Sequence, residues 1–298
     1  MKIIKSFSIS LLFGFIALST PSTSIAKSSV WKASKNGGHL FLGGTVHFLA
    51  ADDYPLPCEF DLAYSVSDKL YFETDVEKVQ SQELAFELIN KGVYPFGEDL
   101  STRLSKTTLA ALSDYLNSVG LPSAGFMKYK PGLLMSFITL AELNKLGIQA
   151  EGVDVYFSKL AIRDNKSVGY FEEPQEQINF IVNLGVDNEE NFINYLVENS
   201  KQFENQFLGM REGWRNGEMN VLTDFSEIDD LRTNFPNIFS TLITKRNEQW
   251  LTKIDQLILN PEVEYVLVGA LHMAEKEGLL ARLESKGYQI DQLSCHYK

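Results

Sequence analysis

The feature that most constrains the fold is an apolar run that ends in Gly-x-x-His and occurs twice. The first copy is Leu40-Phe41-Leu42-Gly43-Gly44-Thr45-Val46-His47, and the second is Tyr265-Val266-Leu267-Val268-Gly269-Ala270-Leu271-His272. Consecutive apolar residues, as opposed to alternating ones, are typical of a strand that is buried on both faces. Glycine allows the backbone to turn or a ligand to approach where the strand ends. Both copies therefore predict a central strand with a histidine at its carboxyl edge, where open α/β sheets bind ligands.

Further strands cluster toward the two ends of the chain. Val30–Ala33 and 39–43 predict a hairpin around the turn 35–38, and 69–75 and 166–172 predict strands that end in carboxylates. From 81 to about 162 the pattern is mostly helical. We expect one α/β domain over 27–298, with a central, mostly parallel or mixed sheet, flanking helices and a helical insert at about 81–162.

The N-terminus has the features of a secretory signal. Lys2 and Lys5 precede an apolar stretch from Phe7 to Leu18, and small residues lead to Ala26. The apolar stretch is too short for a transmembrane helix, so we expect cleavage after Ala26, no membrane span in the mature chain, and a periplasmic or secreted product. A retained N-terminal anchor is the alternative.

Charge and cysteine content narrow the function further. The formal net charge of −12 argues against binding nucleic acid, and no basic patch offsets it. The chain has two cysteines, Cys58 and Cys295, and an even count in an exported protein permits a disulfide between them. Two unpaired, partly buried thiols are the alternative.

Four strand ends carry groups that can do chemistry: His47, Glu73, Glu172 and His272. Two histidines and a carboxylate, here His47, His272 and Glu73, are an adequate ligand set for Zn²⁺, Mn²⁺, Co²⁺ or Fe²⁺. Such a metal would activate a water molecule, and a carboxylate not used as a ligand could be the base. Arg246, which we expect at the rim of this site, could hold a substrate carboxylate or a developing oxyanion.

Each of these residues also has a structural alternative. The histidines could be buried and hydrogen-bonded to backbone, and Glu73 or Glu172 could cap a helix or form an ion pair. For Arg246 we favour pairing with one of the buried carboxylates over contact with substrate. The catalytic assignments to Glu73, Glu172 and Arg246 are therefore hypotheses.

Several short motifs resemble the TraB/PrgY/GumN family, which is related to the Tiki proteins. They are Gly-Gly-Thr-Val-His, Tyr-Phe-Glu-Thr-Asp, Gly-Val-Asp, Gly-Tyr-Phe-Glu-Glu-Pro-Gln-Glu-Gln, Lys-Arg-Asn and Val-Gly-Ala-Leu-His, in this order between Trp31 and Gly287. The resemblance implies a fold akin to the erythromycin-esterase and ChaN-like proteins, and for the Tiki branch a metal-dependent protease centre. By this resemblance, the histidines of the family's two Gly-x-x-His motifs correspond to His47 and His272. The acidic residue that follows the family's second core strand corresponds to Glu73. Glu172 and Arg246 match less diagnostic positions, and Phe171 stands where the family has an aliphatic residue.

Three functions are consistent with these observations. The first is a periplasmic metal-dependent hydrolase that acts on peptides or small amides. The second is a non-catalytic protein that binds a peptide, haem or a metal in the same cleft, and the third is a metal-free, esterase-like hydrolase with a histidine base. Family membership does not by itself decide among them.

The signal sequence gives the first testable prediction. We expect the exported protein to begin at Lys27, because Ala26 ends the small-residue stretch that a signal peptidase recognises. Mass spectrometry of the intact exported protein measures its N-terminus. A product that begins at Met1 or Lys2 would contradict the prediction.

Overall fold

A six-stranded mixed sheet is the centre of the molecule. The computed structural model describes residues 26–226 and 228–295, and the predicted signal sequence lies outside them except for Ala26. Strand order is β6-β4-β7-β2-β1-β8, and a separate two-stranded sheet pairs β3 with β5. The strands are β1 (Ala26–Lys35), β2 (Gly38–Thr45), β3 (Phe48–Leu49), β4 (Lys69–Phe72), β5 (Ala150–Glu151), β6 (Ser167–Tyr170), β7 (Glu264–Gly269) and β8 (Gln289–Cys295).

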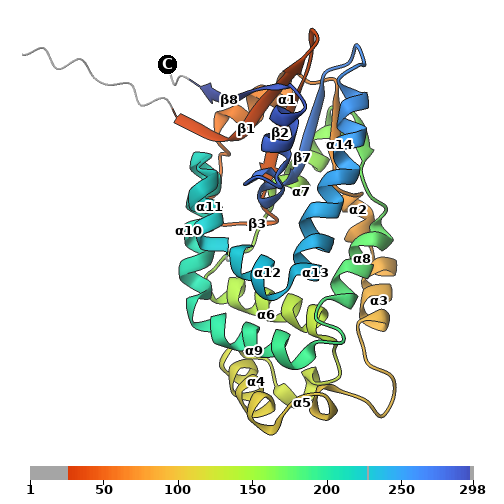
Figure 1. The fold of residues 1–298 in the computed structure, drawn as a ribbon, viewed down its shortest axis with the longest axis vertical. Helices are drawn as coiled ribbons and strands as arrows, with labels where there is room; N and C mark the ends of the chain where they lie inside the picture. Colours follow the sequence, from red (N-terminus) through yellow and green to blue (C-terminus); the bar gives the residue numbers. More distant parts are fainter. Residues whose placement is uncertain (1–25, 227, 296–298) are drawn as a thin grey trace, which may run out of the picture.

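The helices occupy most of the rest of the chain (Figure 1). They are α1 (Cys58–Val66), α2 (Val76–Val79), α3 (Gln82–Lys91), α4 (Lys106–Ser118), α5 (Ser123–Phe126), α6 (Pro131–Lys145), α7 (Val153–Arg163), α8 (Pro174–Asn183), α9 (Glu189–Asn199), α10 (Phe203–Asn216), α11 (Met219–Ser226), α12 (Ile228–Asn234), α13 (Pro236–Phe239), α14 (Lys245–Leu257) and α15 (Leu279–Ser285). A π-helical turn, η4 (Ser240–Thr244), joins α13 to α14, and the short 3-10 turn η5 (Ala270–Met273) follows β7. The predicted α/β class with flanking helices is confirmed.

Four adjacent strands of the sheet are parallel. β6 pairs with β4, β4 with β7, and β7 with β2, all in parallel register. The two Gly-x-x-His segments therefore follow neighbouring strands, as predicted, although they are 225 residues apart in the sequence. Their register is offset by one residue, because Thr45 lies opposite Gly269 and Gly44 lies opposite Val268.

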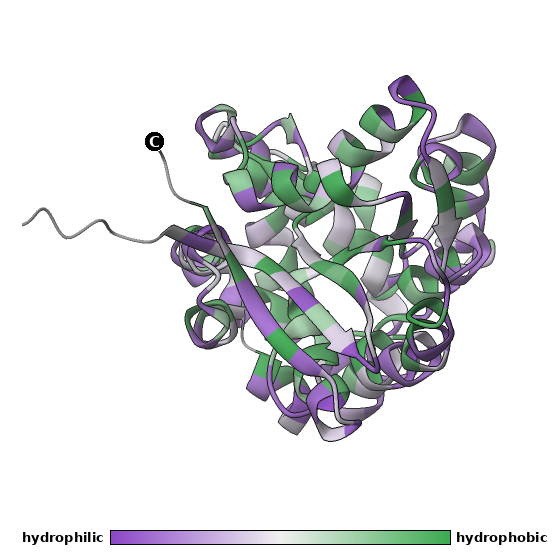
Figure 2. Ribbon diagram, turned by 90° about the horizontal axis from the view of Figure 1, so that it is seen from above, coloured by the Kyte–Doolittle hydropathy of each residue, from purple (hydrophilic) through white to green (hydrophobic). Residues whose placement is uncertain are grey.

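The predicted hairpin between β1 and β2 is confirmed. Its turn residues Asn36 and Gly37 both have positive φ, 53° and 87°, which is the backbone of the two-residue turns that match strand twist. β8 adds to the outer side of β1 as an edge strand and has partly exposed positions along its length. Figure 2 shows hydrophilic and hydrophobic residues mixed along this strand, next to the C-terminus.

Each face of the sheet packs against its own set of helices. On one face Phe41, Tyr265 and Leu267 pack with residues of α1, α7 and α10. On the other face Leu42, Val268 and their neighbours pack with α14 and α15. Because consecutive strand residues point to opposite faces, uninterrupted apolar runs are needed to fill both cores.

A third core lies away from the sheet, in the helical part of the molecule. Leu112 and Leu116 of α4, Leu134 and Ile138 of α6, and Ile193 of α9 form it. Figure 1 shows α4, α5, α6 and α9 at the end of the molecule opposite the β1–β2 turn. By contrast α7, whose sequence lies within 81–162, packs on the sheet.

Two further observations concern export and membranes. Cys58 at the start of α1 and Cys295 at the end of β8 form a disulfide, with their Cα atoms 6.2 Å apart. A bridge that closes a loop this long contributes about 2–4 kcal/mol to stability. Between residues 26 and 295, none of the helices that the structure describes has both the length and the apolarity needed to cross a bilayer.

Candidate functional site

Polar side chains follow all four parallel strands at the same edge of the sheet. In strand order they are Glu172 after β6, Glu73 after β4, His272 after β7 and His47 after β2. Carboxyl ends of parallel strands meet at one edge, so the four residues that the sequence singled out form one row. Backbone pairing continues past the strands, since the N–H of Glu172 donates to the carbonyl of Glu73 at 2.8 Å.

Arg246 of α14 joins the two carboxylates. Its Nε donates to Glu172 Oε1 at 2.6 Å, one Nη donates to Glu172 Oε2 at 3.0 Å, and the same Nη also donates to Glu73 Oε2. We expected Arg246 at the rim, but it is 7% exposed and lies among the site residues. The reason is that two buried carboxylates need a counter-charge, and a planar guanidinium has enough N–H groups to donate to both of them. The structural pairing that we favoured for it is what the structure shows.

Glu172 is held entirely by N–H donors. Besides two from Arg246, it accepts from Gln177 Nε2 at 2.6 Å and from the indole of Trp250 at 3.0 Å. Burial raises the pKa of Glu172, and the bonds from Arg246 and Gln177 oppose the rise. Four donors and no acceptor around it favour the ionised form, which fixes the carboxylate in place.

Glu73 connects the guanidinium of Arg246 to the end of β7. Its Oε1 accepts from the N–H of Gly269 at 2.6 Å, and a Cβ on Gly269 would lie 3.1 Å from that oxygen. A glycine at the motif position thus allows the carboxylate to approach the backbone closely. Burial opposes ionisation, but Arg246 and the nearby histidines outweigh it and lower the pKa of Glu73 to about 2.

His272 is buried as a neutral imidazole. Its Nδ1 lies 2.7 Å from Oδ1 of Asn247, and its Nε2 lies 3.1 Å from an Nη of Arg246. Because the amide oxygen only accepts and the guanidinium only donates, the proton is on Nδ1 and the lone pair is on Nε2. Burial, together with Arg246, lowers the pKa of His272 to about 3 despite Glu73. Trp250 packs against the ring at a centroid distance of 4.4 Å.

His47 differs from the buried residues because its side chain is 62% exposed. Its Nδ1 lies 3.0 Å from Oδ2 of Asp154 at the start of α7. The preceding Gly152 packs closely on the carbonyls of Val46 and His47, and the N–H of Val153 donates to Val46. This contact brings α7 to the end of β2. The Asp154 carboxylate raises the pKa of His47, with a smaller contribution from Glu73.

Sequence reasoning missed four residues of this site: Asp154, Gln177, Asn247 and Trp250. Three of them lie within motifs that the sequence already showed: Asp154 in Gly-Val-Asp, Gln177 in Glu-Glu-Pro-Gln-Glu-Gln and Asn247 in Lys-Arg-Asn. Membership of these motifs was the sequence signal that could have identified them as site residues. The contacts show that each holds a site residue in place.

We tested whether the donors fit the metal that the resemblance implies. Nε2 of His272 and Oε1 of Glu73 lie 4.0 Å apart, but Arg246 occupies the imidazole lone pair and puts a positive charge beside both. Among the described residues, three side chains have donor atoms close enough together to hold a metal ion: Cys58, Glu59 and Cys295. The sulfurs of the two cysteines form the disulfide. In the present arrangement of side chains, the donor atoms of His47, His272 and Glu73 do not converge as metal ligands do. Metal ligation by these three residues therefore stays a prediction.

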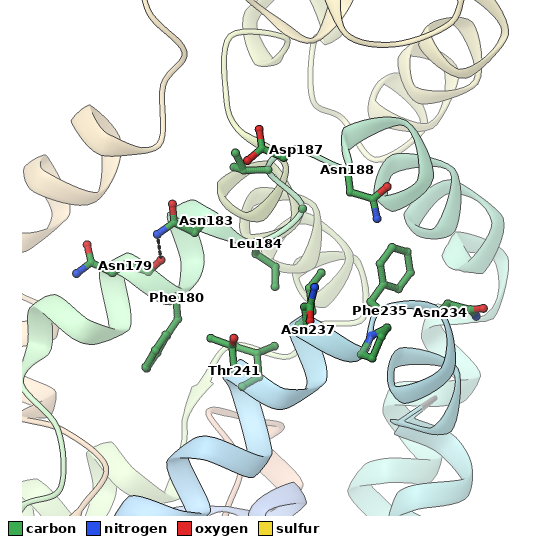
Figure 3. Close-up of a pocket in the computed structure, with 15 residues that line it drawn as sticks. Asn179, Phe180, Asn183, Leu184, Asp187, Asn188, Asn234, Phe235, Asn237 and Thr241 are labelled. Atoms are coloured by element: carbon green, nitrogen blue, oxygen red, sulfur yellow. Dashed lines mark hydrogen bonds between the residues drawn. The ribbon is translucent and has the colours of Figure 1, made fainter.

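A pocket of about 670 Å³ adjoins this site. Its lining includes Phe180 of α8 and Leu242 of η4 (Figure 3). Both contact Arg246, whose guanidinium lies 5.3 Å from the Phe180 ring centroid and donates to the carbonyl of Leu242. A molecule in this pocket would therefore lie one side chain away from the buried guanidinium.

Fold and site together define an α/β protein with a row of histidines and carboxylates along the carboxyl edge of its parallel strands. The chain belongs to the TraB/PrgY/gumN family, whose model matches residues 29–292. The resemblance that the motifs indicated is thus confirmed over nearly the whole of the described chain. No curated protein matches the sequence significantly.

Replacing Arg246 tests the charge balance of the site. We expect Arg246→Met to lower the free energy of unfolding at pH 7 by about 3–5 kcal/mol, because two buried carboxylates lose their counter-charge. Urea unfolding measures this loss. As a control, Arg163→Met removes an exposed arginine and should change the unfolding midpoint little.

The sign of the pH dependence gives a second readout on the same variant. In the natural protein the lowered pKa of Glu73 contributes stability above its unfolded value near 4.5, and this stability is lost as the pH falls toward 2. Without Arg246 the carboxylate is buried unpaired, so its pKa rises and protonation stabilises the fold. Stability of Arg246→Met should therefore increase from pH 7 to pH 5. A decrease equal to that of the natural protein would contradict this account.

Proposed function

We propose that this protein is an exported hydrolase of amide or ester bonds in which His47, oriented by Asp154, is the general base. The observation that carries the proposal is the arrangement of the imidazole. One ring nitrogen is held by a carboxylate, and Nε2 has no hydrogen-bond partner among the residues that the structure describes. This is the orientation of a histidine that accepts a proton from water.

The chemistry follows from this orientation. Nε2 of His47 takes a proton from a water molecule as its oxygen adds to the substrate carbonyl. Asp154 and Glu73 favour the imidazolium that forms, because both contribute to raising the pKa of His47 to about 9. The neutral base is therefore present as the pH rises toward 9, and turnover by this route is greatest at alkaline pH. The same Nε2–H then protonates the leaving amine or alkoxide, which restores the neutral base.

The buried residues position the site in this proposal. Arg246, Glu172 and Trp250 hold the strand ends together, and Asn247 orients the ring of His272. One oxygen of Glu73 is fixed by the N–H of Gly269, so the negative charge that contributes to the raised pKa of His47 is held in a constant position. Export is supported by the signal-like N-terminus and by the disulfide between Cys58 and Cys295.

A metal-dependent hydrolase is the second candidate, and one observation favours it. Asn247 binds Nδ1 of His272 and leaves the lone pair on Nε2, 4.0 Å from Glu73, which is how a neighbouring residue commonly orients a metal-ligating histidine. A divalent cation held by His47, His272 and Glu73 would supply a water of lowered pKa. Arg246 would have to release His272 first.

Substitutions of His47 and Asp154 test the assignment of the general base. With an internally quenched peptide library as substrate, we expect His47→Ala to lower turnover by about 10²–10⁴-fold with an unchanged unfolding midpoint. Asp154→Asn should lower the maximal turnover reached at alkaline pH, because the ring loses its orienting partner. It should also move the acid limb of the pH–rate profile to lower pH, because Asp154 raises the pKa of His47. His39→Ala, on the same strand far from the site, is the control. If the natural protein cleaves no member of the library, or if His47→Ala retains full activity, the proposal fails.

Metal analysis separates the two candidates. We expect purified protein dialysed against EDTA to keep its activity and to contain Zn, Mn, Co and Fe well below one equivalent, because Arg246 already pairs with both carboxylates. Inductively coupled plasma mass spectrometry measures the metal content. One equivalent of metal, lost together with activity on chelation and absent from both His47→Ala and His272→Ala, would establish the metal-dependent alternative instead.

A further inference from the structure

Two adjoining pockets form a groove beside the site. The larger, of about 670 Å³, lies between the end of α8, the 184–188 loop and the α12–α13 segment. The smaller, of about 510 Å³, lies against α9, and the two share Asn234 and Phe235. Figure 3 shows Asn188 and Asn237 pointing into the space between α8, α9 and α13 in the larger pocket.

Asparagine is unusually concentrated in this groove. Seven of the chain's 18 asparagines line the two pockets. They are Asn179, Asn183, Asn188, Asn191, Asn194, Asn234 and Asn237. The carboxamides of Asn234 and Asn237 have no hydrogen-bond partner within the part of the chain that the structure describes. Each carboxamide presents an N–H donor next to a carbonyl acceptor, which are the same two groups that a peptide unit presents.

The charge of the groove excludes anionic ligands. Its charged lining residues are Asp187 and Glu198, and neither pocket has a lysine or arginine in its lining. The rest of the lining is uncharged, with apolar side chains such as Leu184, Ile238 and Leu242 beside the asparagines. A ligand without negative charge that carries both amide groups and apolar substituents matches this surface.

The aromatic residues of the groove argue against a sugar. Phe235 is buried and packs edge-on against Phe192 and Tyr195, at centroid distances of 5.6 and 5.3 Å. The ring of Phe180 has the guanidinium of Arg246 over its face. Stacking of a pyranose needs an exposed, open aromatic face, but Phe235 and Tyr195 pack against each other and one face of Phe180 is covered by Arg246.

From these observations we infer that the groove binds an extended segment of a peptide substrate that carries no acidic side chains, remote from the bond that is cleaved. The carboxamides of Asn234 and Asn237 pair with the peptide main chain, and the apolar lining receives its side chains. Phe180 and Leu242 connect the groove to Arg246 and so to the row of strand ends. The inference rests on the proposed hydrolase function and adds to it the substrate class and a selection against acidic segments.

Direct binding tests the groove independently of turnover. The probe is a fluorescein-labelled, acetylated and amidated decapeptide of Ala, Val, Leu, Ser and Asn, and the protein is the full mature chain carrying His47→Ala. Fluorescence polarisation should show saturable binding that weakens about tenfold on adding Asn234→Ala and Asn237→Ala, since two neutral hydrogen bonds are lost. The control Asn220→Ala, an exposed asparagine on α11, should leave the affinity unchanged. A decapeptide with alternating Glu residues should bind more weakly than the neutral one.

The outcomes for the groove and for the hydrolase are distinct. Saturable binding that depends on Asn234 and Asn237 supports the groove even if the natural protein cleaves nothing, in which case the hydrolase proposal alone fails. Cleavage with an unchanged KM in the double variant overturns the groove proposal and leaves the hydrolase intact. Absence of neutral-peptide binding, or competition by maltohexaose but not by unlabelled peptide, also overturns it.

Discussion

The site depends on one buried guanidinium. Glu73 and Glu172 end neighbouring parallel strands, and the row cannot bury two carboxylates side by side without a positive charge between them. Arg246 supplies that charge from α14, a helix that packs on one face of the sheet through Trp250 and Ile254. The same guanidinium then donates toward His272, so the positions of three site residues follow from where α14 packs.

The parallel pairing of β2 and β7 explains how distant segments reach one site. The hairpin of β1 and β2 comes early in the chain and β7 comes late, and the helical part of the molecule lies between them in sequence. Bringing the two Gly-x-x-His segments to one edge needs only that their strands be adjacent and parallel. The intervening helices are then free to form the groove next to that edge, as α8, α9 and α13 do.

Much of this arrangement could be predicted from the sequence, for identifiable reasons. Apolar runs without alternation predicted buried strands, and the residues after them predicted which side chains share an edge. The position of Arg246 could not be predicted, because a helical residue's depth depends on how the whole helix packs. The partner of His47 was missed for a similar reason: Asp154 is 107 residues away, and only the contact of Gly152 with the end of β2 brings it near. The asparagine-rich groove was also missed, because its residues come from separate segments between 179 and 237 with no shared spacing.

The neutral state of His272 determines the electrostatic potential at the mouth of the site. With His272 uncharged, the buried groups consist of two carboxylates and one guanidinium, which leaves one uncompensated negative charge beneath His47. Asp154 adds a second negative charge beside the exposed imidazole, so protonation of His47 reduces the net negative charge of the site without cancelling it. A substrate with a basic group near the reacting carbonyl would be attracted while the row is anionic, and one with an acidic group there would be repelled.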